Sequence, residues 1–222
     1  WENISLPGIC MKTVQELELI NSTTGEKLIK LPFHNLEETK AKLVAAGKVQ
    51  AEWKKTSLSH RISIIQGSMD YFRENAGTIA RDITLQMGKP ISQSRNELKG
   101  MTQRSDVICG LAEDALQDIS LPNVEGFNRF IRREPLGVVL DIAAWNYPLL
   151  IAVNVIVPAV LSGNAVAIKH SSLTPLCAIA FEDAFRNAGA PEGLVTAIIL
   201  DHQDTESIIQ SKLIHHIAFT GS

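Results

Sequence analysis

The chain has 222 residues, of which 45% are hydrophobic and 20% charged, a balance typical of one or two globular domains with a substantial core. Its net charge of −3 at pH 7 argues against binding to nucleic acid or to an anionic membrane surface. The longest apolar run, at 149–161, is too short to cross a bilayer and is interrupted by Asn154 and Pro158.

The first half of the chain predicts a pair of strands followed by four helices. Two short strands are expected within 14–33, on either side of a Thr24-Gly25 turn. Asn35 and Glu38 form a capping-box pattern that opens the first helix. The four helices are expected over 35–55, through the apolar positions Ile62, Ile65, Met69 and Phe72, over 79–87, and over 92–117.

Residues 127–134 alternate apolar and charged side chains, as a half-exposed strand does. Three of the charged residues are arginines, Arg129, Arg132 and Arg133. They suit a solvated edge, whose charge would only discourage aggregation between sheet edges.

The second half alternates short apolar strands with helices. Residues 138–144 predict a strand buried on both faces, and Pro148 suits the first turn of the apolar helix that follows, at 149–161. The remaining elements are expected as strands at 165–168, 194–200 and 214–219 and as helices at 176–187 and 204–211, with Ser171, Ser172 and Thr174 as candidate N-caps. Such alternation with short connections predicts a parallel, doubly wound α/β sheet with right-handed crossovers.

Ligands of such sheets bind beyond the carboxyl ends of the strands. The residues expected there are Trp145, Asn146, Lys169, Gly221 and Ser222. An amide, an ammonium group and a glycine at a helix start suit a nucleotide and an oxyanion. Asn146 alone would equally suit a turn, and Lys169 alone a solvated surface. No two glycines are separated by a single residue, so the usual dinucleotide-binding fingerprint is not formed.

Five short motifs follow one another in the second half of the chain. They are Glu134-Pro-Leu-Gly-Val, Trp145-Asn-Tyr-Pro-Leu, Lys169 followed by Thr174-Pro-Leu, Gly189-Ala-Pro-Glu-Gly, and Phe219-Thr-Gly-Ser. In this order and spacing they resemble the NAD(P)-dependent aldehyde dehydrogenase superfamily. The N-terminal part is similar too, at 21–26, at Trp53, and at Leu85 with Met87-Gly-Lys-Pro. The resemblance covers nearly the whole chain except the first dozen residues.

The resemblance implies a Rossmann-like NAD(P)-binding core at 138–222, a β-hairpin for oligomerisation at 125–137, and N-terminal strands and helices at 1–124 that pack on the core. The expected cofactor is NAD or NADP and the expected substrate an aldehyde. The full-length protein would form a homodimer or a homotetramer.

The same resemblance assigns roles to individual residues. Asn146 would donate its amide to the oxyanion, Lys169 would hydrogen-bond the adenosine ribose, and Ser222 would meet the pyrophosphate. Ser172 falls where NAD-preferring members often place glutamate, which favours acceptance of NADP. One departure is Ala144, where many members carry proline. The remaining cofactor-binding residues are expected to be Ile142, Ala143, Ala144, Trp145, Ser171 and Gly221; no metal site is expected.

The family's nucleophilic cysteine and general-base glutamate lie beyond the last motif, so the 222 residues alone should be inactive. If the chain were naturally complete, it would instead be a non-catalytic nucleotide-binding or subunit-interaction fragment. Cys10, Cys109 and Cys177 show no C-x-x-C spacing and predict free thiols of a reducing compartment. With no signal peptide evident in 1–13, we expect a cytoplasmic protein.

Overall fold

Four parallel strands form the centre of the molecule. The structure, a computed structural model, describes residues 15–221. The strands are β5 (Val138–Ala143), β6 (Ala165–His170), β7 (Val195–Ala197) and β8 (His216–Phe219), in the spatial order β7-β6-β5-β8. The chain therefore steps twice in one direction from β5 and then crosses to its other side. This is a doubly wound sheet, with its switch point between β5 and β8, and it confirms the predicted fold class.

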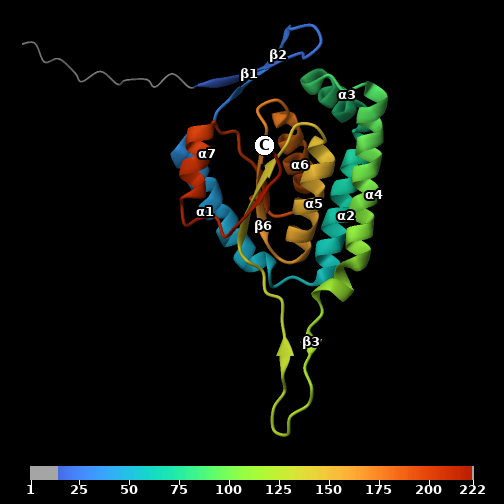
Figure 1. Cartoon of the computed structure of the whole chain (residues 1–222), viewed down its shortest axis with the longest axis vertical. Coiled ribbons are helices and arrows are strands. Elements are labelled where there is room, and N and C mark those ends of the chain that lie inside the picture. Colours follow the sequence, from blue (N-terminus) through green and yellow to red (C-terminus); the bar gives the residue numbers. More distant parts are fainter. Residues whose placement is uncertain (1–14, 222) are drawn as a thin grey trace, which may run out of the picture.

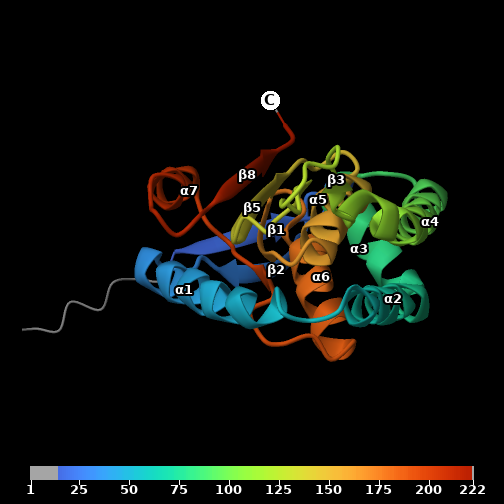
Figure 2. The same cartoon turned by 90° about the horizontal axis from the view of Figure 1, so that it is seen from below.

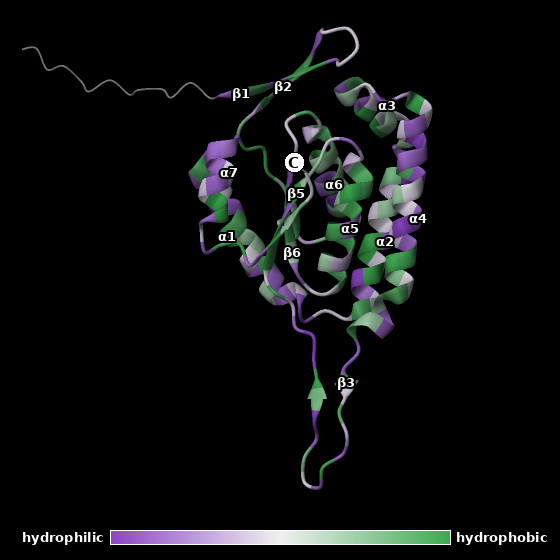
Figure 3. Cartoon of the chain, in the orientation of Figure 1, coloured by the Kyte–Doolittle hydropathy of each residue, from purple (hydrophilic) through white to green (hydrophobic). Residues whose placement is uncertain are grey.

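Helices cover both faces of this sheet (Figures 1 and 2). One face packs against α5 (Pro148–Leu161) and α6 (Pro175–Asn187), and the other against α1 (Leu36–Trp53), while α7 (His202–Ile209) lies beside α1. Outside α5 and α6 lie α2 (Leu58–Glu74), α3 (Ala76–Met87) and α4 (Ile91–Leu116). Figure 3 shows hydrophobic residues concentrated in β5, β6 and α5. Because α5 lies between the sheet and the N-terminal helices, its apolar residues are buried on nearly every side.

The N-terminal helices also supply polar partners to the C-terminal end of α5. The indole nitrogen of Trp53 donates to the carbonyl oxygen of Val160 at 3.0 Å, and Nη1 of Arg61 donates to that of Leu161 at 2.9 Å. Nε2 of Gln50 reaches the carbonyl oxygen of Gly163 at 2.9 Å. Carbonyls that a helix end leaves unpaired are thereby satisfied inside the protein.

Two hairpins extend from this body. The strands β1 (Glu16–Ile20) and β2 (Lys27–Pro32) pair antiparallel, as predicted around Thr24-Gly25. A long second hairpin projects from the opposite end (Figure 1), and its arms form only the short ladder of β3 (Ile119–Ser120) with β4 (Phe130–Ile131) and an isolated bridge between Val124 and Phe127. The strand predicted at 127–134 is thus much shorter, because its residues are exposed and most have no neighbouring strand. The division into domains at 1–124, 125–137 and 138–222 stays a prediction.

Several predicted boundaries shift. The strand expected at 194–200 ends at Ala197, and the one expected at 214–219 begins at His216. His215 instead joins β8 to β5, because its Nδ1 accepts the backbone N–H of Val138 at 3.1 Å. Its ring lies so close to Gly137 that a Cβ there would be 2.7 Å from it, and the φ of +130° also favours glycine.

Candidate active site at the carboxyl end of the sheet

The loop between β5 and α5, residues 144–147, leaves the carboxyl end of the sheet beside the switch point. Trp145, Asn146 and Tyr147 are all exposed there. The side-chain oxygen of Asn146 accepts the backbone N–H of Tyr147 at 3.1 Å. The acceptor end of the Asn146 amide is therefore occupied, and among the described residues its NH₂ group has no hydrogen-bond partner. This arrangement leaves two N–H donors free for a ligand.

A buried ion pair lies beneath this loop. Lys89 and Glu97 form a salt bridge in which the side chains are 6% and 0% exposed. Nζ of Lys89 also donates to the backbone oxygen of Asn146 at 2.8 Å and lies 4.0 Å from the centroid of the Tyr147 ring. Oε1 of Glu97 accepts the N–H groups of Leu149 at 2.9 Å and Leu150 at 3.3 Å, at the start of α5. The pair thus holds both the loop and the helix that follows it.

Sequence reasoning missed this pair as a part of the site. Lys89 was recognised only as part of the Met87-Gly-Lys-Pro motif, and Glu97 only as a position in the long amphipathic helix predicted over 92–117. A usable signal was present, because Glu97 falls among the buried positions of that helix, with Ser94, Leu98 and Met101. A carboxylate in a buried helical stripe needs a partner, but the stripe does not say which residue provides it.

Lys169 lies next to last in β6, in register with Ile142 of β5. Its side chain is buried, and burial lowers the pKa of its ammonium group, while Asp201 at the start of α7 acts to raise it. No hydrogen bond or salt bridge to its ammonium group is found among the described residues, and Nζ is not one of the fully buried atoms that lack a partner. A lysine at a strand end without a polar partner in this part of the chain is suited to an anionic or hydroxylated ligand.

The residues that follow Lys169 form the start of the next turn. The backbone N–H of Ser171 donates to the oxygen of Ala143 at 2.9 Å, and its Oγ accepts the N–H of Leu173 at 3.3 Å. Ser172 is exposed. Of the three candidate N-caps, Thr174 is the N-cap of α6, whereas Ser171 and Ser172 precede it. The Thr174 side chain makes no capping hydrogen bond, and Oε1 of Gln86 accepts the N–H of Leu176 at 3.2 Å.

The strand ends bring most of the predicted residues to one edge. Register pairs Ala143 with His170 and Ile142 with Phe219, and the N–H of Thr220 donates to the oxygen of Ile142 at 2.9 Å. Ala144, Trp145, Asn146, Ser171, Ser172 and Gly221 all follow directly from these strands. Ser222 lies outside the described residues. The roles assigned to these residues stay predictions, but their common edge is an observed feature of the fold.

Two titratable residues missed by the sequence reading lie inside the same strands. Asp141 and His170 are 1% and 4% exposed, and neither side chain has a hydrogen-bond partner among the described residues. Burial raises the pKa of Asp141 to about 8. Burial, with a further contribution from Lys169, lowers the pKa of His170 to about 3. Both side chains are therefore neutral near pH 7.

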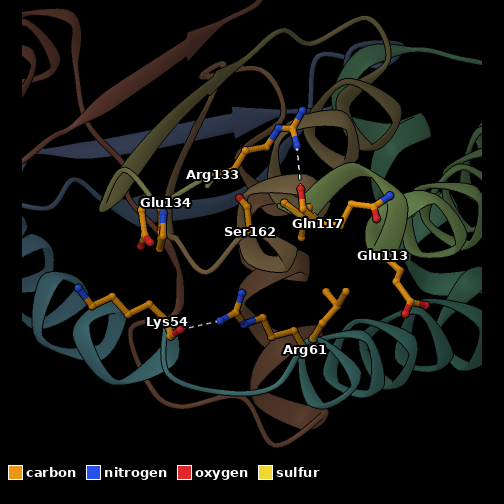
Figure 4. Close-up of a pocket in the computed structure, with 10 residues that line it drawn as sticks. Lys54, Arg61, Glu113, Gln117, Arg133, Glu134 and Ser162 are labelled. Carbon is orange, nitrogen blue, oxygen red and sulfur yellow. Dashed lines mark hydrogen bonds between the residues drawn. The ribbon is translucent and has the colours of Figure 1, made fainter. Parts of the chain in front are cut away.

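A hollow of about 380 Å³ lies at the other end of the sheet (Figure 4). Lys54, Arg61, Arg133 and Glu134 contribute to its wall. The arginines are already engaged, since Arg61 donates to the oxygen of Lys54 at 2.8 Å and Arg133 to that of Gln117 at 3.2 Å. None of the predicted site residues lines this hollow, so its size does not identify it as the active site.

The cysteines of the described residues are not activated. Cys109 and Cys177 are buried and free, and burial is the main cause that raises the pKa of each thiol. A thiol with a raised pKa is a poor nucleophile at neutral pH. Cys10 lies outside the described residues.

Residues 15–221 contain no group of three or more His, Cys, Asp or Glu side chains that could hold a metal ion. Nor does any helix in that span have the length and apolar character needed to cross a membrane.

Comparison with known proteins gives one consistent family. Residues 10–222 match the aldehyde dehydrogenase family. The chain is 30% identical over 207 residues to the 3,6-anhydro-alpha-L-galactose dehydrogenase of Streptomyces coelicolor, covering 93% of this chain and 42% of that protein. It is also 30% identical to the NADP(+) succinate-semialdehyde dehydrogenase of Deinococcus radiodurans, covering 91% of this chain and 42% of the relative.

A solved structure agrees. The NAD-dependent benzaldehyde dehydrogenase of Corynebacterium glutamicum superposes with a TM-score of 0.86 at 25% identity, over 95% of this chain and 46% of that one. The 222 residues therefore span less than half the length of the relatives that they match.

Proposed function

Because this chain belongs to the aldehyde dehydrogenase family, we propose that it forms the cofactor-binding half of an enzyme that oxidises an aldehyde to a carboxylic acid with NAD or NADP. The observation that carries this proposal is the Asn146 amide. It is exposed beside the switch point of the sheet, with its oxygen held by the N–H of Tyr147 and its NH₂ group open. A fixed amide donor in this place is suited to a negative charge that develops on an oxygen.

The chemical part of the proposal is covalent catalysis. A cysteine thiolate supplied by protein outside these 222 residues attacks the aldehyde carbon, and the carbonyl oxygen becomes negatively charged. Asn146 donates Nδ2–H to that oxygen. A donor of this kind stabilises a transition state by ~2.7–4 kcal/mol. Once the cofactor has accepted a hydride from that carbon, a thioester remains, and its hydrolysis by water releases the acid and the cysteine thiol.

The cofactor, when bound, accepts a hydride from the substrate carbon. The residues present fit a nicotinamide dinucleotide at the carboxyl end of the sheet. Lys169 is a largely buried residue whose ammonium group has no polar partner among the described residues, which suits hydroxyl or phosphate oxygens. The exposed Ser172 follows in the same turn, and Gly221 follows β8 across the switch point.

We further propose that the complete enzyme accepts NADP at least as well as NAD. A glutamate at position 172 would repel a 2′-phosphate, and two like charges ~4 Å apart cost about 4 kcal/mol at an effective dielectric of 20. Ser172 removes that repulsion, and because it is exposed, solvent would reduce the full figure. Ser172→Glu should lower kcat/KM for NADP about tenfold or more while changing that for NAD little. Strong preference of the wild type for NAD, unaltered by the substitution, would contradict this.

The hairpin that carries β3 and β4 is proposed as a subunit contact of a homodimer or homotetramer in the cytoplasm. Phe127, Phe130 and Ile131 are 68%, 42% and 51% exposed on it, an apolar surface that another chain would cover. Sedimentation of the complete protein checks this. A stable monomer would contradict it.

The enzymatic proposal is tested on the complete natural protein that contains this chain. Simple aldehydes are supplied with NADP or NAD, and formation of the reduced cofactor is followed by its absorbance. Turnover is expected in the wild type. The fragment of residues 1–222, assayed alongside, should show none, because neither of its described cysteines is an activated nucleophile.

A further inference from the structure

We infer that Lys89 and Glu97 are positioning residues that orient the Asn146 amide for catalysis by clamping the peptide bond that follows it. The inference rests on the proposed function and adds two residues to it. Its evidence is a set of contacts that meet on residues 146–150, the end of the loop and the first turn of α5.

The peptide between Asn146 and Tyr147 is held at both of its polar atoms. Its carbonyl oxygen accepts from Nζ of Lys89 at 2.8 Å, and its N–H donates to the side-chain oxygen of Asn146 at 3.1 Å. Rotation of this peptide would therefore move the side-chain oxygen of Asn146 and carry the NH₂ group with it. Lys89 touches no reacting atom, but it determines the direction in which the Asn146 amide points.

Glu97 holds both the Lys89 ammonium group and the first turn of α5. One carboxylate oxygen pairs with Nζ of Lys89, and the other accepts the N–H groups of Leu149 and Leu150. A carboxylate at the start of a helix is further stabilised by the helix dipole. The first turn of α5 and the Asn146 peptide are thus tied to a single buried group, so the loop cannot move independently of the helix.

The clamp is supplied from distant parts of the chain. Lys89 follows Gly88, the left-handed C-cap of α3 with a φ of +77°, and Glu97 belongs to α4. Both lie more than fifty positions before the residues that they hold, as the sequence separations of 57 and 52 show. The N-terminal helices therefore contribute to the chemistry that is proposed for the sheet edge.

Gln86 offers a matched control. It is 3% exposed, and its Oε1 accepts the N–H of Leu176 at 3.2 Å, at the start of the neighbouring helix α6. Removing it takes away a buried cap of the same kind from a helix that does not carry Asn146. A merely structural loss should therefore be common to both positions, whereas an effect through Asn146 should be confined to Lys89 and Glu97.

The experiment uses the complete natural protein with NADP and an aldehyde that it oxidises. The variants are Lys89→Met, Glu97→Gln, Gln86→Leu, Asn146→Ala and the double variant Lys89→Met with Asn146→Ala. Lys89→Met should lower kcat by about tenfold or more with little change in the KM for cofactor, since an oriented donor is worth ~100–1000-fold in kcat. In the Asn146→Ala background the same change should alter kcat by less than about twofold.

Gln86→Leu should leave kcat within about twofold of the wild type. The inference is overturned if Gln86→Leu and Lys89→Met lower kcat equally, or if Lys89→Met keeps its full effect without the Asn146 amide. Should Lys89→Met fail to fold, Glu97→Gln replaces it in the same cycle, because its remaining oxygen still accepts from Leu149.

If the wild type does not oxidise aldehydes, the proposed function is refuted. The positions of Lys89, Glu97 and the Asn146 amide can then still be tested by a structural measurement. Crystal structures of Glu97→Gln and Gln86→Leu then compare the loop at 144–147. The inference expects a displaced Asn146 amide only in Glu97→Gln, and an unmoved amide there would overturn it.

Discussion

The two ends of α5 are closed by different chemistry. At its C-terminal end, Trp53, Arg61 and Gln50 donate to backbone carbonyls, and the chain leaves a hollow of about 380 Å³ nearby. At its N-terminal end, a buried ion pair holds the first turn, and the residues above it present exposed donors. Both closures come from the N-terminal helices, and both satisfy groups that a helix end leaves unpaired.

The hollow and the proposed site therefore lie at opposite ends of the sheet. Two side chains in the wall of the hollow, Arg61 and Arg133, already donate to backbone carbonyls. The carboxyl end instead combines an open amide at Asn146 with the ammonium group of Lys169, which has no polar partner among residues 15–221. The proposed chemistry lies at the strand ends, where doubly wound sheets bind their ligands.

The largest effect is expected from the exposed donor itself. Asn146→Ala in the complete enzyme should lower kcat by about 100–1000-fold, or ~2.7–4 kcal/mol, while thermal stability changes little, because the side chain is exposed. Steady-state kinetics and thermal unfolding measured on the same preparation check both parts. A loss below tenfold would show that Asn146 is only a turn residue.

At the C-terminal end of α5 a substitution should lower stability strongly and kcat little, the reverse of the result expected for Asn146→Ala. Arg61→Leu removes donors to the carbonyls of Leu161, Lys54 and Thr56 from a largely buried position. We expect a loss of about 3 kcal/mol in the free energy of unfolding, since hydrogen bonds to charged groups contribute ~1.5–3 kcal/mol each and are partly replaced by water. kcat at a temperature where the variant is folded should stay within about twofold. Urea unfolding provides the measurement, and a large fall in kcat would contradict the separation of the two ends.

Asp141 in β5 and His170 in β6 are two buried titratable residues with opposite pKa shifts, and they predict how stability depends on pH. The folded-state pKa of Asp141 is raised to about 8, so the folded protein retains a proton that the unfolded chain loses above its ordinary pKa, and stability falls as the pH rises to about 8. The pKa of His170 is lowered to about 3, so the unfolded chain binds the extra proton, and stability rises with pH up to the ordinary histidine pKa of 6.5.

The contributions of Asp141 and His170 to the free energy of unfolding oppose each other between about pH 4 and 6.5. Above pH 6.5 only the contribution of Asp141 still changes with pH. The free energy of unfolding should therefore be nearly flat over that range and then fall by about 2 kcal/mol towards pH 8. Asp141→Leu should abolish the fall and leave stability rising to pH 6.5. Denaturant unfolding at a series of pH values tests this, and an unchanged profile in the variant would contradict the assignment.

Much of the fold follows from local patterns, because its strands and helices alternate with clear apolar runs. The strand at 138–144, the helix beginning at Pro148 and the capping box of Asn35 and Glu38 were all predictable in this way, and the structure has them. Strand ends in a parallel sheet share an edge, so Asn146 and Lys169 could be grouped before any coordinates. The ladder of β3 and β4 could not be predicted in its length, because exposed alternation does not specify how many residues pair.

The features that were missed depend on contacts between distant parts of the chain. Lys89 and Glu97 contact residues 146–150 only in the folded chain, so no local sequence pattern predicts these contacts. Asp141 lies within an apolar run and His170 at the end of one. A single polar residue in such a run does not change the prediction of a buried strand, so neither residue was singled out. In both cases the available signal was a charged or titratable residue at a buried position, which requires either a partner or a shifted pKa.

We propose that the cofactor binds at the carboxyl end of the sheet and not in the hollow at the other end. Equilibrium binding of NADP to the complete protein tests it most directly, with Lys169→Met compared against Arg133→Met, which alters the wall of that hollow. We expect Lys169→Met to weaken binding by about tenfold or more, the equivalent of one hydrogen bond to a charged group, and Arg133→Met to leave it unchanged. Weaker binding in Arg133→Met with wild-type affinity in Lys169→Met would contradict the account.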